Sequence, residues 1–277
     1  MVESGKRMEQ LKSYLRRLSE GESLDRVCAD FMREFKDIDA VEIMEAEQQM
    51  IKEGMPIAEV QKLCDIHSAL FHGATLEEKI ANARQPVDVV SLREERAEKT
   101  RELVETTGHP LFTLTQENEA LEKVIARIRE QLDRKVTEAA GTGTAVNSSR
   151  NTGENTVSRE LLSEIWELAI HYAKKGDLLY PLLKVKYGIS GPSDVMWTTD
   201  DEIRDELSGL AKAKGQDEAW KQRMERALTR AEEMVYKEAN ILFPNCAVHF
   251  TEEEWVGIYQ DAKDYDVCLS VEPKSWE

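Results

Sequence analysis

Apolar residues recur every three or four positions over most of this chain, which is the period of amphipathic helices. In the first 77 residues this pattern is punctuated by Gly21, Gly54 and Gly73, and Pro56 lies where a new helix could begin. Short turns between such helices are typical of compact helical domains. We therefore predict an all-helical N-terminal domain over residues 1–77.

A strongly charged stretch follows over residues 78–105, with Pro86 as a break and a helical pattern from Leu92 to Val104 that carries few apolar positions. Such a helix has little surface to bury against a core. We expect this stretch to be a connector that lets the flanking domains touch without sharing a core.

The clearest helical pattern begins after Pro110, a residue that suits a first helical turn. Its positions are spaced alternately by three and four: Leu111, Leu114, Asn118, Leu121, Ile125, Ile128 and Leu132. The polar, glycine-rich residues 137–157 that come next cannot bury enough apolar surface to order themselves, and we predict a flexible loop there.

Three further helices are predicted over residues 158–180, 196–210 and 220–242, and Thr251 to Glu254 form a capping box for a shorter one. Together with the helix after Pro110 they give an up-down four-helix bundle over residues 106–265. Residues 266–277 form a tail whose apolar part is expected to pack as an extended segment. The predicted fold class is therefore all-α.

Two of these helices contain matching segments, HYAKKGDLLYP at residues 171–181 and MVYKEANILFP at residues 234–244. Because proline cannot continue a helix, we expect both helices to end in the same register. Ten residues before the prolines stand His171 and Met234, and six residues before them stand Lys175 and Glu238. Residues four apart share a helical face. A His-x-x-x-Glu pair repeated on two helices presents ligands to iron at a bundle centre, and here each helix keeps half of that pair.

These segments, with VMWTTDDEIR at residues 195–204, resemble the hemerythrin-type HHE cation-binding domain. The runs EGMPI at residues 53–57 and LCDIHSALF at residues 63–71 resemble the helical domain of unknown function 438, which is fused to some of these bundles. The resemblance implies a hemerythrin-like bundle that binds metal, with non-haem iron as the expected cofactor. It also implies a sensor of oxygen, nitric oxide or redox state.

The composition narrows the remaining classes of function. A formal net charge of −17 disfavours binding to nucleic-acid backbones or acidic membranes through a basic face. The N-terminus lacks the apolar core of a signal peptide, and no stretch is apolar enough to span a membrane, so we expect a cytoplasmic protein. No nucleophile elbow or phosphate loop is present, and we do not expect an enzyme.

Two interpretations of the bundle centre remain open. In the first, His171 and Glu238 bind one metal ion, with help from Glu117 or Asp200, and the protein responds to a diatomic gas and signals to an unknown protein partner. In the second, Lys175 replaces the positive charge of the metal and pairs with Glu238 or Asp201. The protein is then a metal-free interaction or scaffold module with a salt-bridged core.

A second candidate site would lie at the junction of the two domains. Cys64 and His67 are three residues apart on one predicted helical face, and His109 marks the mouth of the bundle. If the N-terminal domain docks there, these side chains could converge on a metal ion or on a haem iron. Cysteine and histidine at this spacing are also ordinary core residues.

Overall fold

The computed structural model describes residues 40–56, 91–133 and 156–276, with short stretches between residues 9 and 31. Helices make up its architecture, and the described residues contain no β-strand beyond an isolated antiparallel bridge from Cys268 to Val271. The predicted all-α class is confirmed. None of the described helices is long and apolar enough to cross a membrane.

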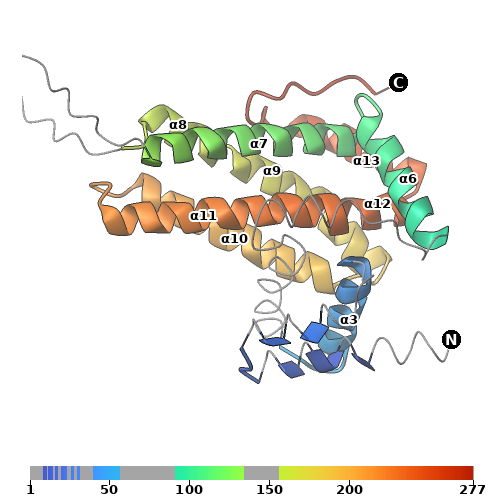
Figure 1. The fold of residues 1–277 in the computed structure, drawn as a ribbon. Coiled ribbons are helices and arrows are strands. Elements are labelled where there is room, and N and C mark those ends of the chain that lie inside the picture. The colour runs from blue at the N-terminus through green and yellow to red at the C-terminus, as the bar shows by residue number, and fades with distance from the viewer. Residues whose placement is uncertain are drawn as a thin grey trace, which may run out of the picture.

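The centre of the molecule is a bundle of helical rods that lie side by side (Figure 1). The first rod is α7 (Pro110–Asp133), and the third is α10 (Gly191–Ala211). The second rod comprises α8 (Arg159–Trp166), α9 (Leu168–Lys174) and the π-helical segments η1 (Lys175–Leu179) and η2 (Leu182–Lys186). The fourth comprises α11 (Glu218–Lys237), the π-helical η3 (Glu238–Leu242) and α12 (Phe243–His249).

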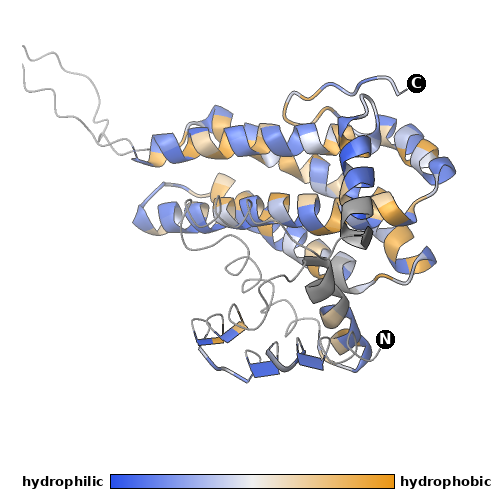
Figure 2. Ribbon diagram, turned by 45° about the vertical axis from the view of Figure 1, so that its right-hand side comes forward, coloured by the Kyte–Doolittle hydropathy of each residue, from blue (hydrophilic) through white to orange (hydrophobic). Residues whose placement is uncertain are grey.

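The alternating pattern after Pro110 is the seam of this bundle. Its apolar members Leu111, Leu121, Ile125 and Ile128 are at most 1% exposed. In Figure 2 hydrophobic and hydrophilic residues alternate along α7 and α11, as expected of amphipathic rods with one buried face. Asn118 is buried in the same row, and its amide therefore needs a polar partner inside the bundle.

Both prolines lie within a helix, and the prediction that the helices end there is wrong. The second rod continues past Pro181 to Lys186, and the fourth continues past Pro244 to His249. A π-type turn precedes each proline: the backbone N–H of Tyr180 bonds the carbonyl of Lys175, and that of Phe243 bonds the carbonyl of Glu238. Such a turn is wider than an α turn and shifts the hydrogen-bond register, so the proline ring and its missing N–H are tolerated.

Shorter helices close one end of the bundle. They are α6 (Ser91–Glu105), α13 (Glu252–Asp261) and the 3₁₀ turn η4 (Ala262–Asp264). The predicted capping box opens α13: Thr251 Oγ1 accepts the Glu254 N–H, and the Thr251 N–H donates to Glu254 Oε2 at 2.8 Å. The tail follows, and its Cys268 and Leu269 are buried in the bundle core.

Helix α6 differs from the expected connector. It packs against α7 and α12, and Leu103 and Val104 near its C-terminal end contact the bundle core. Among its described side chains only Thr100 is buried and Leu103 and Val104 are partly buried, so few apolar residues suffice.

The N-terminal part of the chain contacts the bundle through α3 (Ala40–Lys52), which packs against α10 and η3 (Figure 1). Ile51 and Met55 pack on the buried Val195, and Gln48 Nε2 donates to the carbonyl oxygen of Gly188 at 2.7 Å.

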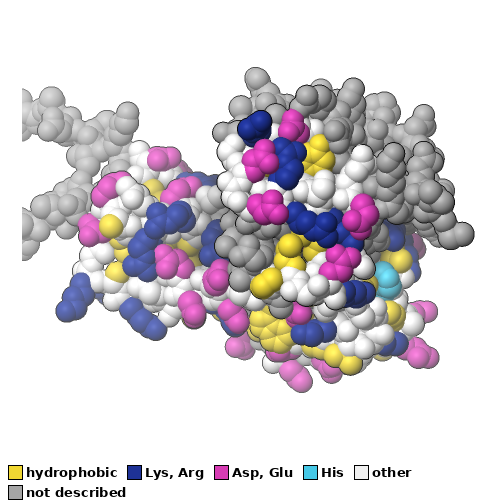
Figure 3. Space-filling model, turned by 90° about the horizontal axis from the view of Figure 1, so that it is seen from below, with side chains coloured by type: hydrophobic (Ala, Val, Ile, Leu, Met, Phe, Trp, Pro, Cys, Tyr) yellow, Lys and Arg dark blue, Asp and Glu magenta, His cyan; other side chains and the backbone are white. Residues whose placement is uncertain are grey.

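On the face seen in Figure 3, basic and acidic side chains of the described residues are interspersed.

Candidate functional site

A layer of charged side chains crosses the centre of the bundle. Its members come from all four rods, and none is more than 5% exposed: Glu117, His171, Lys174, Lys175, Asp200 and Glu238. We call this set the charge layer. Burying so many charges is unfavourable unless each is paired and hydrogen-bonded, and the layer provides those partners.

The imidazole of His171 bridges two carboxylates. Its Nδ1 lies 2.8 Å from Glu117 Oε2, and its Nε2 lies 2.8 Å from Glu238 Oε2. Burial alone lowers the pKa of His171, but Glu238 and Glu117 outweigh it and raise that pKa to about 9. At neutral pH His171 is therefore an imidazolium that donates a hydrogen bond on each side.

Lys175 is held between two carboxylates on the other side of Glu238. Its Nζ contacts Glu238 Oε1, lies 3.2 Å from Asp200 Oδ1 and stands 4.2 Å from the centroid of the Tyr172 ring. Burial raises the pKa of Glu238, but Lys175 and His171 oppose it and lower the value to about 2. This glutamate is therefore ionised, and two cations share it.

Asp200 and Glu117 lie at the two ends of the layer. Burial raises the pKa of Asp200 to about 6 although Lys175 opposes it, and its Oδ2 accepts the Tyr180 hydroxyl at 2.9 Å. Glu117 accepts from Lys174, and the contacts with His171 and Lys174 lower its pKa against the opposing effect of burial.

The charges of the layer balance at neutral pH. Three carboxylates, Glu117, Asp200 and Glu238, stand against three cations, His171, Lys174 and Lys175. Such neutrality is what allows ions to be buried at a moderate cost, and an additional cation would disturb it.

As arranged, these donors do not fit a metal ion. Both ring nitrogens of His171 face carboxylates on opposite edges of the imidazole, so Glu117 and Glu238 cannot join that ring around one ion. The Lys175 ammonium lies between Glu238 and Asp200, where an ion would need their oxygens. Among the described residues, no three His, Cys, Asp or Glu side chains are placed to hold a metal ion.

The structure brings together five residues that the sequence had singled out: Glu117, His171, Lys175, Asp200 and Glu238. The proposed pairing of Lys175 with Asp201 is not observed. Asp201 is 47% exposed on its side chain and pairs with Arg204, because one residue along an α-helix turns the side chain by about 100° away from Asp200.

His109 lies apart from the layer, at the closed end of the bundle. Its ring packs 4.6 Å from Trp255 and 4.9 Å from Trp276, measured between centroids. Nδ1 accepts the Leu111 N–H at 3.1 Å, whereas Nε2 is buried without a partner. Cys64 and His67 fall outside the described residues, so the structure does not place the second candidate site.

Sequence reasoning missed three polar members of this region. Asn118 donates from Nδ2 to Glu238 Oε2 at 2.7 Å, Lys174 binds Glu117, and Tyr180 binds Asp200. A polar residue inside the alternating apolar row was the available signal for Asn118. Lys174 follows His171 by three positions and so shares its face, which could have placed it here as well.

Comparison with known families agrees with this architecture. Residues 109–246 match the hemerythrin HHE cation binding domain, and residues 11–77 match DUF438, a family of unknown function. No curated protein and no solved structure matches the chain. The HHE match supports a cation-binding protein. The chain is therefore a hemerythrin HHE cation-binding domain protein with an N-terminal DUF438 segment.

Proposed function

We propose that the cation at the centre of this bundle is the protein's own Lys175 ammonium, and that the protein is a non-enzymatic interaction module that needs no metal ion. The observation that carries this proposal is the position of Lys175 Nζ. It is fully buried, contacts Glu238 Oε1 and lies 3.2 Å from Asp200 Oδ1.

Electrostatics favours this internal cation over a metal. A divalent ion about 4 Å from an ammonium group is repelled by roughly 2 to 8 kcal/mol for effective dielectric constants between water and a protein surface. The six charges of the layer already sum to zero at neutral pH. A metal ion bound there would therefore add uncompensated positive charge to the buried layer.

We propose that this module uses the face formed by α10 and η3 as its interaction surface, and that α3 of the same chain occupies that face. Helix α3, which belongs to the DUF438 match, packs against α10 and η3. These two elements carry Asp200 and Glu238, so the docked helix lies against the segments that hold the charge layer. The same two elements thus carry both the contacts with α3 and two members of the charge layer.

Metal analysis tests this proposal. Protein purified from iron-supplemented cells should contain less than about a tenth of an iron atom per chain by elemental analysis. In the variant Lys175→Glu the ammonium is replaced by a carboxylate, and added Mn²⁺ should raise its Tm while leaving the Tm of the wild type unchanged. The matched control is Lys186→Glu, an exposed lysine of the same rod. Stoichiometric iron in the wild type would overturn the proposal.

A second candidate function is an iron-dependent sensor of oxygen, nitric oxide or redox state in the cytoplasm. It is favoured by the HHE match and by the convergence of His171 with Glu117, Asp200 and Glu238 in one layer. It predicts a visible absorption spectrum and one or more iron atoms in protein purified without oxygen. His171→Ala should then remove the metal, whereas under the first proposal it would only lower stability.

A further inference from the structure

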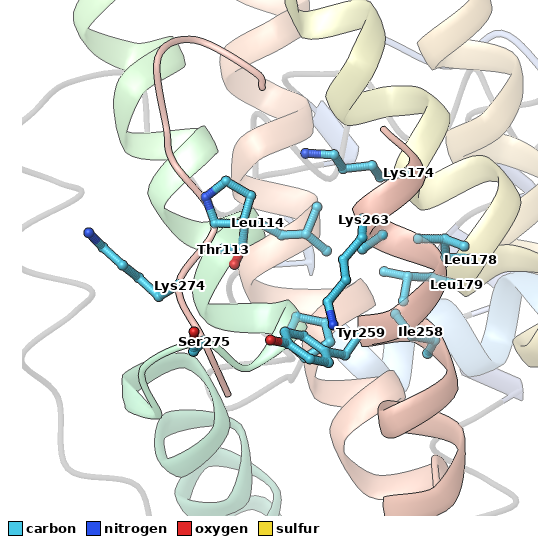
Figure 4. A pocket seen from close by; sticks show the side chains of 14 residues that line it. Thr113, Leu114, Lys174, Leu178, Leu179, Ile258, Tyr259, Lys263, Lys274 and Ser275 are labelled. Carbon is cyan, nitrogen blue, oxygen red and sulfur yellow. The ribbon is translucent and has the colours of Figure 1, made fainter. Parts of the chain in front are cut away.

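A cavity of about 240 Å³ lies outside the charge layer, at the closed end of the bundle (Figure 4). It is lined by the start of α7, the segment η1, helix α13 with η4, and tail residues 273–275. Figure 4 shows Leu114, Leu178, Leu179 and Ile258 around its interior, and Tyr259 at its lower side. The volume is slightly below the range of about 300 to 1,000 Å³ that is usual for drug-sized ligands, so a smaller molecule fits.

Basic side chains and no acidic ones line this cavity, although the protein as a whole is acidic. Its lining includes three lysines, Lys174, Lys263 and Lys274, and no aspartate or glutamate. The chain as a whole has 54 acidic residues against 37 basic ones. The neighbouring carboxylate of Asp177 is not part of the lining, and it accepts the Tyr265 hydroxyl at 2.8 Å.

Polar hydrogens are available beside the apolar lining. Lys263 Nζ stands 4.2 Å from the Tyr259 ring centroid and donates to Gln260 Oε1 at 2.9 Å, which uses one of its three hydrogens. The Tyr259 hydroxyl oxygen accepts the Trp276 N–H at 3.3 Å, so its own hydrogen remains available to donate. In Figure 4 the amine of Lys274, by contrast, points away from the other lining side chains.

We propose that this cavity binds a small carboxylic acid with an apolar body. The apolar body would pack against Leu114, Leu178 and Ile258, and the carboxylate would accept hydrogen bonds from Lys263 Nζ and the Tyr259 hydroxyl. Lys263 is exposed and lies at the edge of the apolar lining, where a charge-assisted hydrogen bond favours an acid over its neutral amide. This inference does not depend on whether the charge layer binds a metal.

The cavity also touches the charge layer at one point. Lys174 lines the cavity, and its Nζ binds Glu117, which in turn binds His171. A ligand in the cavity would therefore contact a residue that also takes part in the charge layer.

Calorimetric titration of the full-length protein tests the site with benzoate and, as a neutral probe of the same shape, benzamide. Benzoate should bind at least about tenfold more tightly than benzamide at fixed ionic strength. Lys263→Met keeps the apolar stem and should weaken benzoate binding at least about tenfold. In Lys212→Met, the matched control at an exposed lysine at the end of α10, outside the cavity lining, affinity should stay within about twofold.

Three results would overturn the proposal. They are equal binding of benzoate and benzamide, unchanged benzoate affinity in Lys263→Met, and no binding of benzoate or hexanoate at 10 mM, about the concentration at which even a weak millimolar site would be nearly saturated. Circular dichroism and Tm of each variant show whether the fold is retained. Should Lys263→Met fail to fold, Ala262→Phe, which reduces the cavity volume, replaces it and should abolish benzoate binding.

Discussion

Two histidines in this bundle are equally buried and yet have opposite electrostatic environments. His171 and His109 are 1% and 0% exposed. His171 bridges two carboxylates, and its pKa rises to about 9. His109 is packed between the rings of Trp255 and Trp276, and burial lowers its pKa to about 4.

The comparison shows that burial alone does not determine the charge of a side chain in this core. Desolvation disfavours the charged form at both positions, but only His171 has anionic partners that outweigh it. The bundle centre is therefore ionic, whereas the immediate surroundings of His109 are aromatic and neutral. Single substitutions should consequently have different effects in the two regions.

The largest expected difference comes from the same substitution at the two histidines. His171→Phe leaves Glu117 and Glu238 without their shared cation and should destabilise the fold by roughly 3 to 5 kcal/mol, the cost of breaking a buried ion pair. His109→Phe keeps an aromatic ring and removes an unpaired Nε2, while losing one hydrogen bond from Leu111 N–H. Its stability should change by no more than about 1 kcal/mol.

Urea denaturation measures the free energy of unfolding of both histidine variants. The control for breaking an ion pair at the surface is Glu206→Gln, because the pair of Glu206 with Arg223 is worth at most about 1 kcal/mol. Equal losses in the two histidine variants would show that the ionic layer contributes no more than ordinary packing.

A smaller effect is expected from pH. The folded-state pKa of His171 lies above the unfolded value of 6.5, so its contribution is complete below pH 6.5 and is lost as the pH rises through about 9. The folded-state pKa of His109 lies below 6.5, so its contribution is present above pH 6.5 and is lost as the pH falls through about 4. Each of these two pKa shifts corresponds to a change of roughly 3 kcal/mol in the free energy of unfolding across its pH range.

Nitrogen-15 NMR of the imidazole rings measures the protonation state of each histidine directly. At pH 7.5 His171 should be doubly protonated and His109 neutral. As the pH falls below 6.5, the free energy of unfolding should also decrease less steeply in His109→Phe than in the wild type. If both rings titrate near pH 6.5, the two histidines do not have opposite electrostatic environments.

The smallest expected effects concern one glycine from each region. Gly108 has φ +84, and a Cβ built there would lie 2.2 Å from the Ser275 carbonyl oxygen, so Gly108→Ala should cost roughly 1 to 3 kcal/mol. Gly176, in η1, has no atom within 4 Å of such a Cβ. Gly176→Ala should therefore be neutral or stabilising by up to about 1 kcal/mol, because alanine has the better helix propensity. Thermal unfolding ranks the two, and the reverse order would contradict the packing of the tail on Gly108.

Much of the site could be predicted from sequence, because a repeated helical register places particular residues at one depth. The matching segments before Pro181 and Pro244 indicated His171, Lys175 and Glu238 together, and the structure places all of them in the charge layer. The same argument failed for the helix ends. Proline normally ends an α-helix because its ring clashes with the preceding turn and it lacks a backbone N–H. A π turn before the proline removes this clash, and no sequence signal for such a turn was recognised.

Partner choice within the layer was harder to predict. Asp200 and Asp201 are adjacent acidic residues, and only the rotation of α10 against η1 determines that Asp200 meets Lys175. Lys174 and Lys175 are likewise adjacent, and they bind Glu117 and Glu238 on different rods. Sequence spacing fixes the face of a helix to within a residue, whereas pairing depends on how the rods are turned in the bundle.

The sequence by itself determined the all-α class and the seam of α7, and it indicated five of the six residues of the charge layer, because these follow from periodicity and residue type. Only the tertiary structure decided that the charges neutralise one another, that both nitrogens of His171 are occupied and that His109 is enclosed by aromatic rings. The physical reason is that the energy of a buried charge depends on its nearest partners, and those partners come from distant parts of the chain.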